Sequence, residues 1–299
     1  MGENGSVNSR GSLSLARLLA AMAGLALLVS ACSGRGDASP SPGPSASATA
    51  VPGSPTRAPT PATTPARPTA TMAAPSATAT ATVRPIPGGQ VFEHGPRDTS
   101  MVALTFDMGG RVDPALDIMN WLIENRVKAT IFMTGAMADN PNTDAGREVL
   151  RLVELHPGLF TLGNHSYSHP DFRELTQTAM ALELLRTENA IDRLVPGLSP
   201  KPFFRPPYGG VDPKVVAGVA AAGYDRIVMW DVDTIDWRPP AEGGPSAGEI
   251  VAKVTGNARG GSIVLMHLGG YNTLEALPDV VAGLRSQGLE PVTLAELLR

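Results

Sequence analysis

Residues 101–110 read Met-Val-Ala-Leu-Thr-Phe-Asp-Met-Gly-Gly. The run up to Phe106 is nearly all apolar and lacks the polar alternation of a half-exposed strand. This pattern is typical of a strand that is buried on both faces of a parallel sheet. Asp107 follows directly, and two glycines then form a turn. The stretch therefore predicts a buried parallel strand with a carboxylate at its carboxyl end.

Strand-like and helix-like stretches alternate six or seven times after this strand. Short apolar runs predict strands at residues 128–133, 159–162, 203–204, 227–230, 262–266 and 291–292. Periodic or capped segments predict helices at residues 114–125, 143–155, 175–194, 213–222, 246–257 and 273–287. Because such alternation is typical of parallel strands joined by helical crossovers, we predict an α/β fold, either a barrel or an open sheet.

Two of the predicted helices share one kind of start. Asp113-Pro114 and Asp212-Pro213 each offer an aspartate side chain followed by a proline. Aspartate is a favoured N-cap, and proline fits the first helical position because its missing N–H would have no partner there. We therefore predict that both aspartates cap the helices that follow them.

Side chains with acid, base or ligand chemistry follow five of the predicted strands. They are Asp107, the pair His165 and His169, Arg205, Asp236 and His267. In parallel α/β folds, catalytic groups collect where the carboxyl ends of the strands meet. Each residue alone has a structural alternative, such as a turn-forming aspartate, a surface ion pair, a helix cap or a buried histidine. Their coincidence at five strand ends instead predicts a catalytic site.

The histidine pair lies within Gly-Asn-His-Ser-Tyr-Ser-His-Pro, residues 163–170. Positions i and i+4 share one face of a helical turn, so both imidazoles can converge on one ion. Neutral imidazole is the commonest side-chain ligand of zinc and similar metals. The pattern predicts a metal site at His165 and His169, and the alternative is two polar residues of a surface loop.

The amino-terminal part, residues 1–31, is predicted to be an export signal. Arg10 and Arg17 precede an apolar run over residues 18–29, which is too short to span a bilayer comfortably. The sequence Val-Ser-Ala-Cys, ending at Cys32, resembles a bacterial lipobox and implies lipid attachment to the cysteine sulfur. The alternative is a plain secretory peptide with an unrelated cysteine. Because the chain has no other cysteine, no internal disulfide is expected.

Residues 32–88 are predicted to form a disordered tether. They consist almost entirely of Pro, Ser, Thr, Ala and Gly, with too few large apolar residues to offset the entropy of ordering. An extended chain of this kind reaches on the order of 100 Å at about 3 Å per residue. We therefore expect an exported, extracytoplasmic domain that is anchored to the cell membrane through lipid.

The remaining part, residues 89–299, is the predicted catalytic domain. The formal net charge of the whole chain is −4. Without an excess of positive charge to bind phosphates, nucleic acid is not expected as a partner. No protein partner is implied by the sequence.

The strand-end residues, taken in order, resemble the polysaccharide deacetylases, which are also called NodB-homology domains or family 4 carbohydrate esterases. The resemblance covers residues 98–298 and rests on five motifs. These are Thr105-Phe106-Asp107, His165-Ser166-x-x-His169, Arg205-x-Pro207-Tyr208, Asp233-x-x-Asp236-Trp237 and Leu265-Met266-His267. The resemblance implies a distorted, often incompletely closed (β/α) barrel, in agreement with the alternation of strands and helices.

The resemblance also implies how an acetyl group would be attacked. Asp107 would be the general base that takes a proton from the attacking water, and Arg205 beside it would favour the ionised carboxylate. His165 and His169 would hold a divalent metal ion, with zinc expected. The backbone N–H of Tyr208 would help to stabilise the tetrahedral oxyanion.

The other half of the implied site serves the leaving group. His267 would be the general acid that protonates the departing amine, and Asp236 would orient its ring and favour the imidazolium form. Trp237 and Leu265 would form a small apolar pocket for the acetyl methyl group.

Position 108 departs from the family pattern. The first motif usually has two adjacent aspartates, of which the second is the third metal ligand, and here that residue is Met108. A thioether is a soft and weak donor for a hard or borderline divalent ion. We expect a two-histidine site completed by water or by Asp107. Such a site should bind metal less tightly, and Asp107 would be less available as the base if it became a ligand.

The favoured hypothesis is a lipid-anchored, metal-assisted hydrolase that removes N-acetyl groups from a cell-envelope or extracellular polysaccharide, such as peptidoglycan or a chitin-like glycan. One alternative is an O-acetyl esterase on the same scaffold, because the same geometry attacks esters. The other is a glycan-binding lipoprotein with impaired catalysis, and Met108 is the reason to consider it.

Overall fold

The structure is a computed structural model that describes residues 88–299. The predicted signal peptide, Cys32 and the tether up to residue 87 lie outside the described residues. Within the described part, no helix combines the length and the apolar character needed to cross a membrane.

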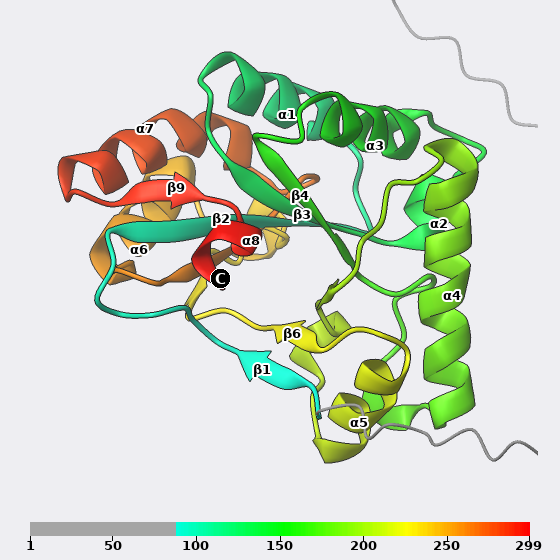
Figure 1. Cartoon of the computed structure of the whole chain (residues 1–299). Coiled ribbons are helices and arrows are strands. Elements are labelled where there is room, and N and C mark those ends of the chain that lie inside the picture. Colours follow the sequence, from blue (N-terminus) through cyan, green and yellow to red (C-terminus); the bar gives the residue numbers. More distant parts are fainter. Residues whose placement is uncertain (1–87) are drawn as a thin grey trace, which may run out of the picture. The chain divides into compact units, whose positions relative to one another are not determined.

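Nine strands form one sheet within residues 88–299, and neighbouring strands run parallel (Figure 1). The hydrogen-bonded order is β1-β6-β5-β4-β3-β2-β8-β7, and β9 pairs with the first half of β2. The strands are β1 (Gln90–Phe92), β2 (Met101–Met108), β3 (Ala129–Met133), β4 (Phe160–Asn164), β5 (Phe203–Phe204), β6 (Arg226–Val228), β7 (Val232–Asp233), β8 (Ile263–His267) and β9 (Glu290–Val292).

Helices connect most of the strands and cover the outside of the curled sheet (Figure 1). They are α1 (Ala115–Glu124), α2 (Gly135–Ala138), α3 (Ala145–Leu155), α4 (Gln177–Leu194), α5 (Pro213–Ala221), α6 (Ala247–Asn257), α7 (Thr273–Ser286) and α8 (Leu294–Leu297). Because β1 and β7 end the strand order without pairing with each other, the sheet is a curled half-barrel of the (β/α) type. The predicted fold class is confirmed.

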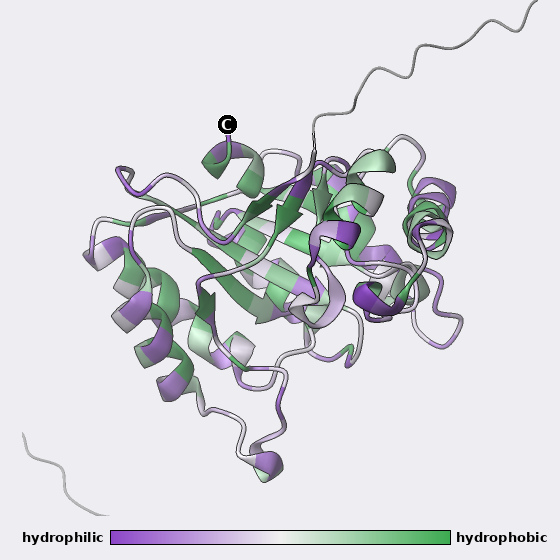
Figure 2. Cartoon of the chain, turned by 90° about the horizontal axis from the view of Figure 1, so that it is seen from below, coloured by the Kyte–Doolittle hydropathy of each residue, from purple (hydrophilic) through white to green (hydrophobic). Residues whose placement is uncertain are grey.

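Strand β2 runs through the centre of the sheet and is buried along nearly its whole length. Its even-numbered side chains, such as Leu104 and Phe106, belong to the large apolar cluster that also contains residues of α1 and α7. Ala103 belongs instead to a second cluster with Phe132 and Ile263, inside the curl of the sheet. Figure 2 shows this arrangement as green strands at the centre and helices with purple outer faces. The run from residue 101 is therefore buried on both faces, as predicted.

The two predicted aspartate caps have different outcomes. The side chain of Asp212 accepts a hydrogen bond from the N–H of Val215 at 2.8 Å, and Pro213 is the first residue of α5, as predicted. The prediction for Asp113 is wrong, because α1 begins only at Ala115 and no side chain caps it. Asp113 instead accepts a hydrogen bond from Arg111 at 2.7 Å, which takes its carboxylate away from the helix.

Candidate active site

The register of the parallel strands aligns their carboxyl ends. Asp107 on β2 pairs with His267 on β8, and Asn164 on β4 pairs with Phe204 on β5. His165 and Arg205 directly follow these last two residues, so they leave neighbouring strands at the same edge. Residues that are up to 160 positions apart in the sequence, from 107 to 267, are therefore brought to one edge of the sheet.

Arg205 and Asp107 form a buried ion pair at this edge. Arg205 Nη1 donates to Asp107 Oδ1 at 2.8 Å, and the arginine side chain is fully buried. Its Nε and Nη2 atoms donate to the carbonyl oxygens of Val228 and Met229, each at 3.3 Å. Since three nitrogens of the guanidinium have partners, the charge is held in place and meets the carboxylate directly.

Two aromatic rings enclose the same guanidinium. Its central carbon lies 4.2 Å from the ring centroid of Phe132 and 5.6 Å from that of Trp230. A guanidinium over an aromatic face is attracted by the ring's quadrupole, and this attraction is larger in a dry site. Gly163 allows this packing, because a Cβ at that position would lie 2.4 Å from the Phe132 ring. Sequence reasoning did not identify Phe132 or Trp230, since neither follows a strand as a polar group would.

The pKa of Asp107 reflects two opposing influences. Burial of the carboxyl raises its pKa, but the charge of Arg205, assisted by His165 and His267, outweighs burial and leaves the pKa below its ordinary value. The carboxylate is therefore ionised at neutral pH, which is the state that a proton acceptor needs.

His165 and His169 face each other through their Nε2 atoms, which are 3.2 Å apart. His165 Nδ1 lies 2.9 Å from the carbonyl oxygen of Arg205, and this contact assigns the ring proton to Nδ1. The Nε2 atom of His165 then carries a lone pair and points toward the space between the two rings. Such an arrangement is typical of a metal-binding histidine, whose other nitrogen donates to a carbonyl or carboxylate.

The pKa values of both rings favour the neutral form. Burial lowers the pKa of His165, and the attraction of Asp107 only partly opposes this. The pKa of His169 falls to about 4, first because the ring is buried and second because His165 lies beside it. Both imidazoles are therefore neutral above mildly acidic pH, which is the state that binds a cation.

Asp236 and His267 form a second pair. Asp236 Oδ1 lies 2.7 Å from His267 Nδ1, and its Oδ2 atom accepts the backbone N–H of His267 at 2.9 Å. Oδ2 also accepts the hydroxyl of Thr273 at 2.6 Å. Burial lowers the pKa of His267, but the hydrogen bond and charge of Asp236 prevail and raise it above its ordinary value. The ring is thus held in one orientation and in a state from which it can donate a proton.

Of the remaining predicted site residues, two are exposed and one is buried. Tyr208 is 71 % exposed, has a left-handed φ of 58°, and its ring packs edge-on against His169 with centroids 4.7 Å apart. Trp237 is 50 % exposed and directly follows Asp236. Leu265 is buried on β8, two residues before His267 and hence on the same strand face. The oxyanion role of Tyr208 and the acetyl pocket of Trp237 and Leu265 stay predictions.

Whether these residues fit a metal ion depends on the donors that they offer. Within residues 88–299, no group of three or more His, Cys, Asp or Glu side chains is arranged to hold one. Two imidazole nitrogens converge, and Asp107 Oδ2 is 3.4 Å from His165 Nε2, although Arg205 engages the other oxygen of that carboxylate. Imidazole nitrogens suit zinc, but catalytic zinc sites usually have three protein ligands. The donors are therefore of the kind that zinc binds, but the site offers one protein ligand fewer than a catalytic zinc site usually has.

Met108 supplies no metal ligand. Its side chain is fully buried and belongs to the apolar cluster of Leu104 and Phe106. It therefore contributes packing and offers no hard oxygen donor.

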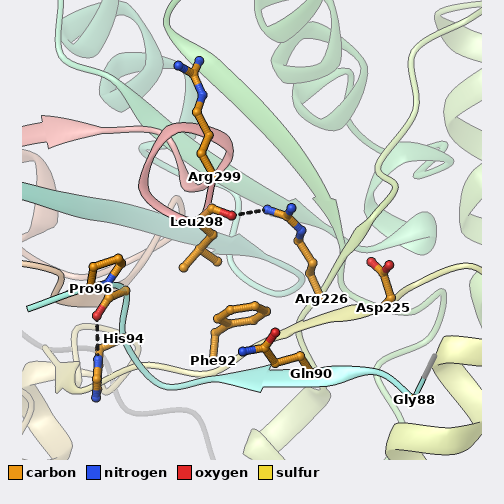
Figure 3. A pocket seen from close by; sticks show the side chains of 10 residues that line it. Gly88, Gln90, Phe92, His94, Pro96, Asp225, Arg226, Leu298 and Arg299 are labelled. Carbon is orange, nitrogen blue, oxygen red and sulfur yellow. Dashed lines mark hydrogen bonds between the residues drawn. The ribbon is translucent and has the colours of Figure 1, made fainter.

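A hollow of about 570 Å³ lies elsewhere on the domain (Figure 3). It is formed along β1 and the segment that follows it, at the amino-terminal end of β6 and beside the last residues of the chain. Gln90, Phe92, His94, Arg226 and Leu298 line it, and Arg226 donates to the Leu298 carbonyl at 2.6 Å. None of the strand-end residues described above takes part in it, so we place the chemistry at the carboxyl edge.

The fold is a parallel (β/α) half-barrel that gathers a buried carboxylate, a histidine pair and an Asp–His pair at one edge of its sheet, which is an arrangement suited to hydrolysis. Residues 94–227 match the sequence profile of the family described as polysaccharide deacetylase. The chain is 34 % identical over 211 residues to a peptidoglycan-N-acetylglucosamine deacetylase of Bacillus cereus, and the match covers 69 % of this chain and 70 % of the relative. The chain belongs to the polysaccharide deacetylase family.

Other relatives differ in length and in activity. The match to a peptidoglycan-N-acetylglucosamine deacetylase of Listeria monocytogenes is 33 % identical and covers 66 % of this chain, but only 38 % of that longer protein. The crystal structure of the Bc1960 peptidoglycan N-acetylglucosamine deacetylase superposes with a TM-score of 0.60 at 31 % identity, covering 71 % of this chain and 93 % of that one. A family 4 pseudoenzyme of Bacillus anthracis gives a TM-score of 0.59 at 28 % identity, covering 70 % and 69 %. Enzymes of this family are generally metal-dependent.

Proposed function

We propose that the domain hydrolyses N-acetyl groups on the sugars of a cell-envelope polysaccharide, releasing acetate and leaving a free amine. The observation that carries this proposal is the meeting of Asp107, Arg205, His165 and His267 at one edge of the sheet. The peptidoglycan deacetylases among the relatives support a peptidoglycan substrate.

The proposed reaction starts with proton removal at Asp107. Its carboxylate is ionised and is held at 2.8 Å from Arg205, so it is ready to accept a proton from the attacking water. The water oxygen then forms a bond to the acetyl carbon. In this proposal the backbone N–H of Tyr208 faces the carbonyl oxygen and stabilises the charge that develops on it.

The reaction ends with protonation of the amine at His267. The C–N bond of the amide breaks most easily if the leaving nitrogen receives a proton, because an amide anion is a poor leaving group. His267 carries that proton on its imidazolium ring, and Asp236 keeps the ring oriented from the other side. Acetate and the sugar amine are the products.

We propose zinc as the ion that His165 and His169 hold. When bound, it would supply Lewis-acid polarisation of the acetyl carbonyl and make the attacking water more acidic. The residues of this chain prepare the site by keeping both rings neutral and their Nε2 atoms 3.2 Å apart.

Acetate release tests the proposed function. The purified domain, residues 88–299, would be incubated with N-acetylated chito-oligosaccharides, with peptidoglycan and with O-acetylated xylan, each with and without added zinc. We expect zinc-dependent acetate release from an N-acetylated glycan. Release from the O-acetylated glycan alone would assign the esterase alternative, and no release from any of the three would contradict the assignment as a hydrolase.

The rate of the reaction is expected to depend on pH through His267. Its raised pKa extends the protonated form of the acid to higher pH than an ordinary histidine allows, and activity should fall as the pH rises through that pKa. Asp236→Asn removes the charge that raises the pKa, and burial then lowers it. The falling limb of the pH–rate profile should therefore move to lower pH, with a loss of turnover at neutral pH. Asp279→Asn, a change of an exposed carboxylate on α7, should leave the profile where it is.

A second candidate function is glycan binding without turnover. Met108 favours it, because the site lacks the carboxylate that would complete a metal centre. A family 4 pseudoenzyme among the structural neighbours shows that the fold persists without activity. This candidate predicts glycan affinity without acetate release and no stoichiometric zinc on the purified domain, and elemental analysis decides between the two.

Met108→Asp tests the role of position 108 directly. The substitution adds an oxygen donor next to Asp107, so zinc affinity should rise by at least about tenfold, since even groups that only support a ligand change metal affinity by about 10- to 100-fold. Calorimetric titration of the metal-free protein with zinc measures this. Met108→Leu, which keeps the apolar packing, is the matched control. Unchanged affinity in the aspartate variant would mean that the side chain at position 108 does not face the histidines.

We further propose that Cys32 carries lipid and holds the domain on the outer side of the cell membrane. The lipobox-like sequence before it supports this location. Metabolic labelling with a radioactive fatty acid should mark the wild-type protein and fail to mark Cys32→Ser. Equal labelling of both would refute the anchor, without any consequence for the chemistry of the domain.

A further inference from the structure

The loop that carries the two histidines, residues 165–169, has an unusual backbone. Ser166 and His169 both have left-handed φ angles, of 68° and 60°, although neither is glycine. Such conformations are costly for residues with a Cβ and persist only where surrounding contacts determine them. The loop therefore depends on the groups that hold it.

Helix α2 holds the carbonyl groups of the loop. The N–H groups of Gly135 and Ala136 donate to the carbonyl oxygens of Ser166 and Tyr167 at 3.0 and 2.9 Å. These are backbone contacts, so side-chain substitutions in α2 would leave the donors in place.

Helix α4 holds the N–H groups of the same loop through one side chain, that of Glu183. Oε2 of Glu183 accepts the N–H of Tyr167 at 2.9 Å and the N–H of Ser168 at 2.7 Å. Oε1 accepts the hydroxyl of Ser168 at 3.0 Å. The Glu183 side chain is only 12 % exposed, and hydrogen bonds to an ionised acceptor are stronger than those between neutral groups.

Ser168 connects Glu183 to the backbone position of His169. Ser168 directly precedes His169, so its N–H fixes the direction in which the chain enters that residue. The N–H of His169 in turn donates to Ser166 Oγ at 3.0 Å. With Glu183 removed, two backbone donors and one hydroxyl lose their acceptor, and the left-handed turn at His169 loses part of its support.

We propose that Glu183 is a positioning residue that sets His169 Nε2 opposite His165 Nε2 and thereby determines zinc affinity. The metal part of this proposal rests on the proposed function. Glu183 touches neither the substrate nor the reacting atoms. It acts through the backbone of the loop, in the way that groups behind metal ligands orient them.

Two variants test the proposal by zinc titration of the metal-free domain. Glu183→Ala removes both acceptor oxygens and should weaken zinc binding by about 10- to 100-fold. Glu183→Gln keeps one acceptor oxygen at nearly the same volume and should recover a large part of the affinity. Amide hydrogen exchange without metal is the second measurement, and the N–H groups of Tyr167 and Ser168 should exchange faster in Glu183→Ala.

Glu296→Ala is the matched control. Glu296 likewise accepts a backbone N–H and a hydroxyl, both from Thr293, but it pairs with Lys128 at the amino-terminal end of β3. This variant measures the general effect of losing such a carboxylate. It should change thermal stability and leave zinc affinity unchanged.

The outcomes separate the positioning role from the metal site. Equal zinc affinity of the wild type and Glu183→Ala would overturn the proposal while the function stands. A wild type without zinc binding would overturn the metal site itself, and with it the effect of Glu183 on affinity. Unchanged amide exchange at Tyr167 and Ser168 in Glu183→Ala would overturn the structural role of Glu183, whether or not the domain binds zinc.

Discussion

Asp107→Asn is expected to lower the rate of acetate release by about 10²- to 10⁴-fold, the usual contribution of a general base. The asparagine oxygen can still accept the hydrogen bond from Arg205, which the carboxylate accepts at 2.8 Å. An amide, however, does not take up a proton from water at neutral pH. The effect should therefore appear in kcat, while the KM for the glycan changes little.

The measurement needs a control for stability, because the substitution also removes the counter-ion of a fully buried arginine. Breaking a buried ion pair by removing one partner is strongly destabilising. Asp231→Asn is a suitable comparison, since Asp231 pairs with Arg97 at 2.9 Å away from the site. If both variants lose activity in proportion to thermal stability, Asp107 is structural and the assignment of the base is wrong.

His267→Ala should lower turnover of an N-acetylated substrate by a similar factor, about 10²- to 10⁴-fold, because the amine then leaves without a donated proton. Zinc content should stay the same, since the proposed ligands are His165 and His169. His156→Ala, which removes an imidazole from the end of α3, is the matched control and should keep full activity.

A change of leaving group sharpens this test. 4-Nitrophenyl acetate releases a phenolate that needs no proton, so its hydrolysis should suffer far less from His267→Ala than that of the amide. An equal loss on both substrates would contradict a role for His267 as the acid. Loss of zinc from the variant would show that the division between ligands and acid is wrong.

The placement of the catalytic groups could be predicted because it follows from one topological rule. In a parallel sheet the carboxyl ends of all strands lie at the same edge, so a carboxylate at the end of β2 and a histidine directly after β4 are expected near each other. The distance of 3.4 Å between Asp107 Oδ2 and His165 Nε2 agrees with that expectation. The residue roles themselves stay predictions.

Groups that support the site were missed because their effect depends on register rather than on residue type. Phe132 lies in a predicted strand and has no local signal that it would face a guanidinium. Glu183 occupies an ordinary helical position, and only the path of α4 beside the histidine loop gives it backbone partners. The short strand β1 was missed because Gln90–Phe92 has three residues, too few for a periodic pattern.

The failed cap at Asp113 has a similar origin. The same Asp-Pro pair forms a cap at Asp212, whose carboxylate accepts the N–H of Val215, and forms none at Asp113, whose carboxylate accepts from Arg111. Local preference was equal in both cases, so the sequence signal alone could not separate them.

Arg205 restricts how the site could be redesigned. Its side chain holds the proposed base, and its own carbonyl oxygen accepts the proton that sets the tautomer of His165. A substitution there would keep the backbone carbonyl but leave the buried carboxylate of Asp107 without its cation, so directed evolution toward new substrates has little freedom at this position. Tyr208 and Trp237 are exposed, and neither takes part in the hydrogen bonds of Arg205. Libraries intended to change glycan preference should therefore vary these two aromatic residues and keep position 205 constant.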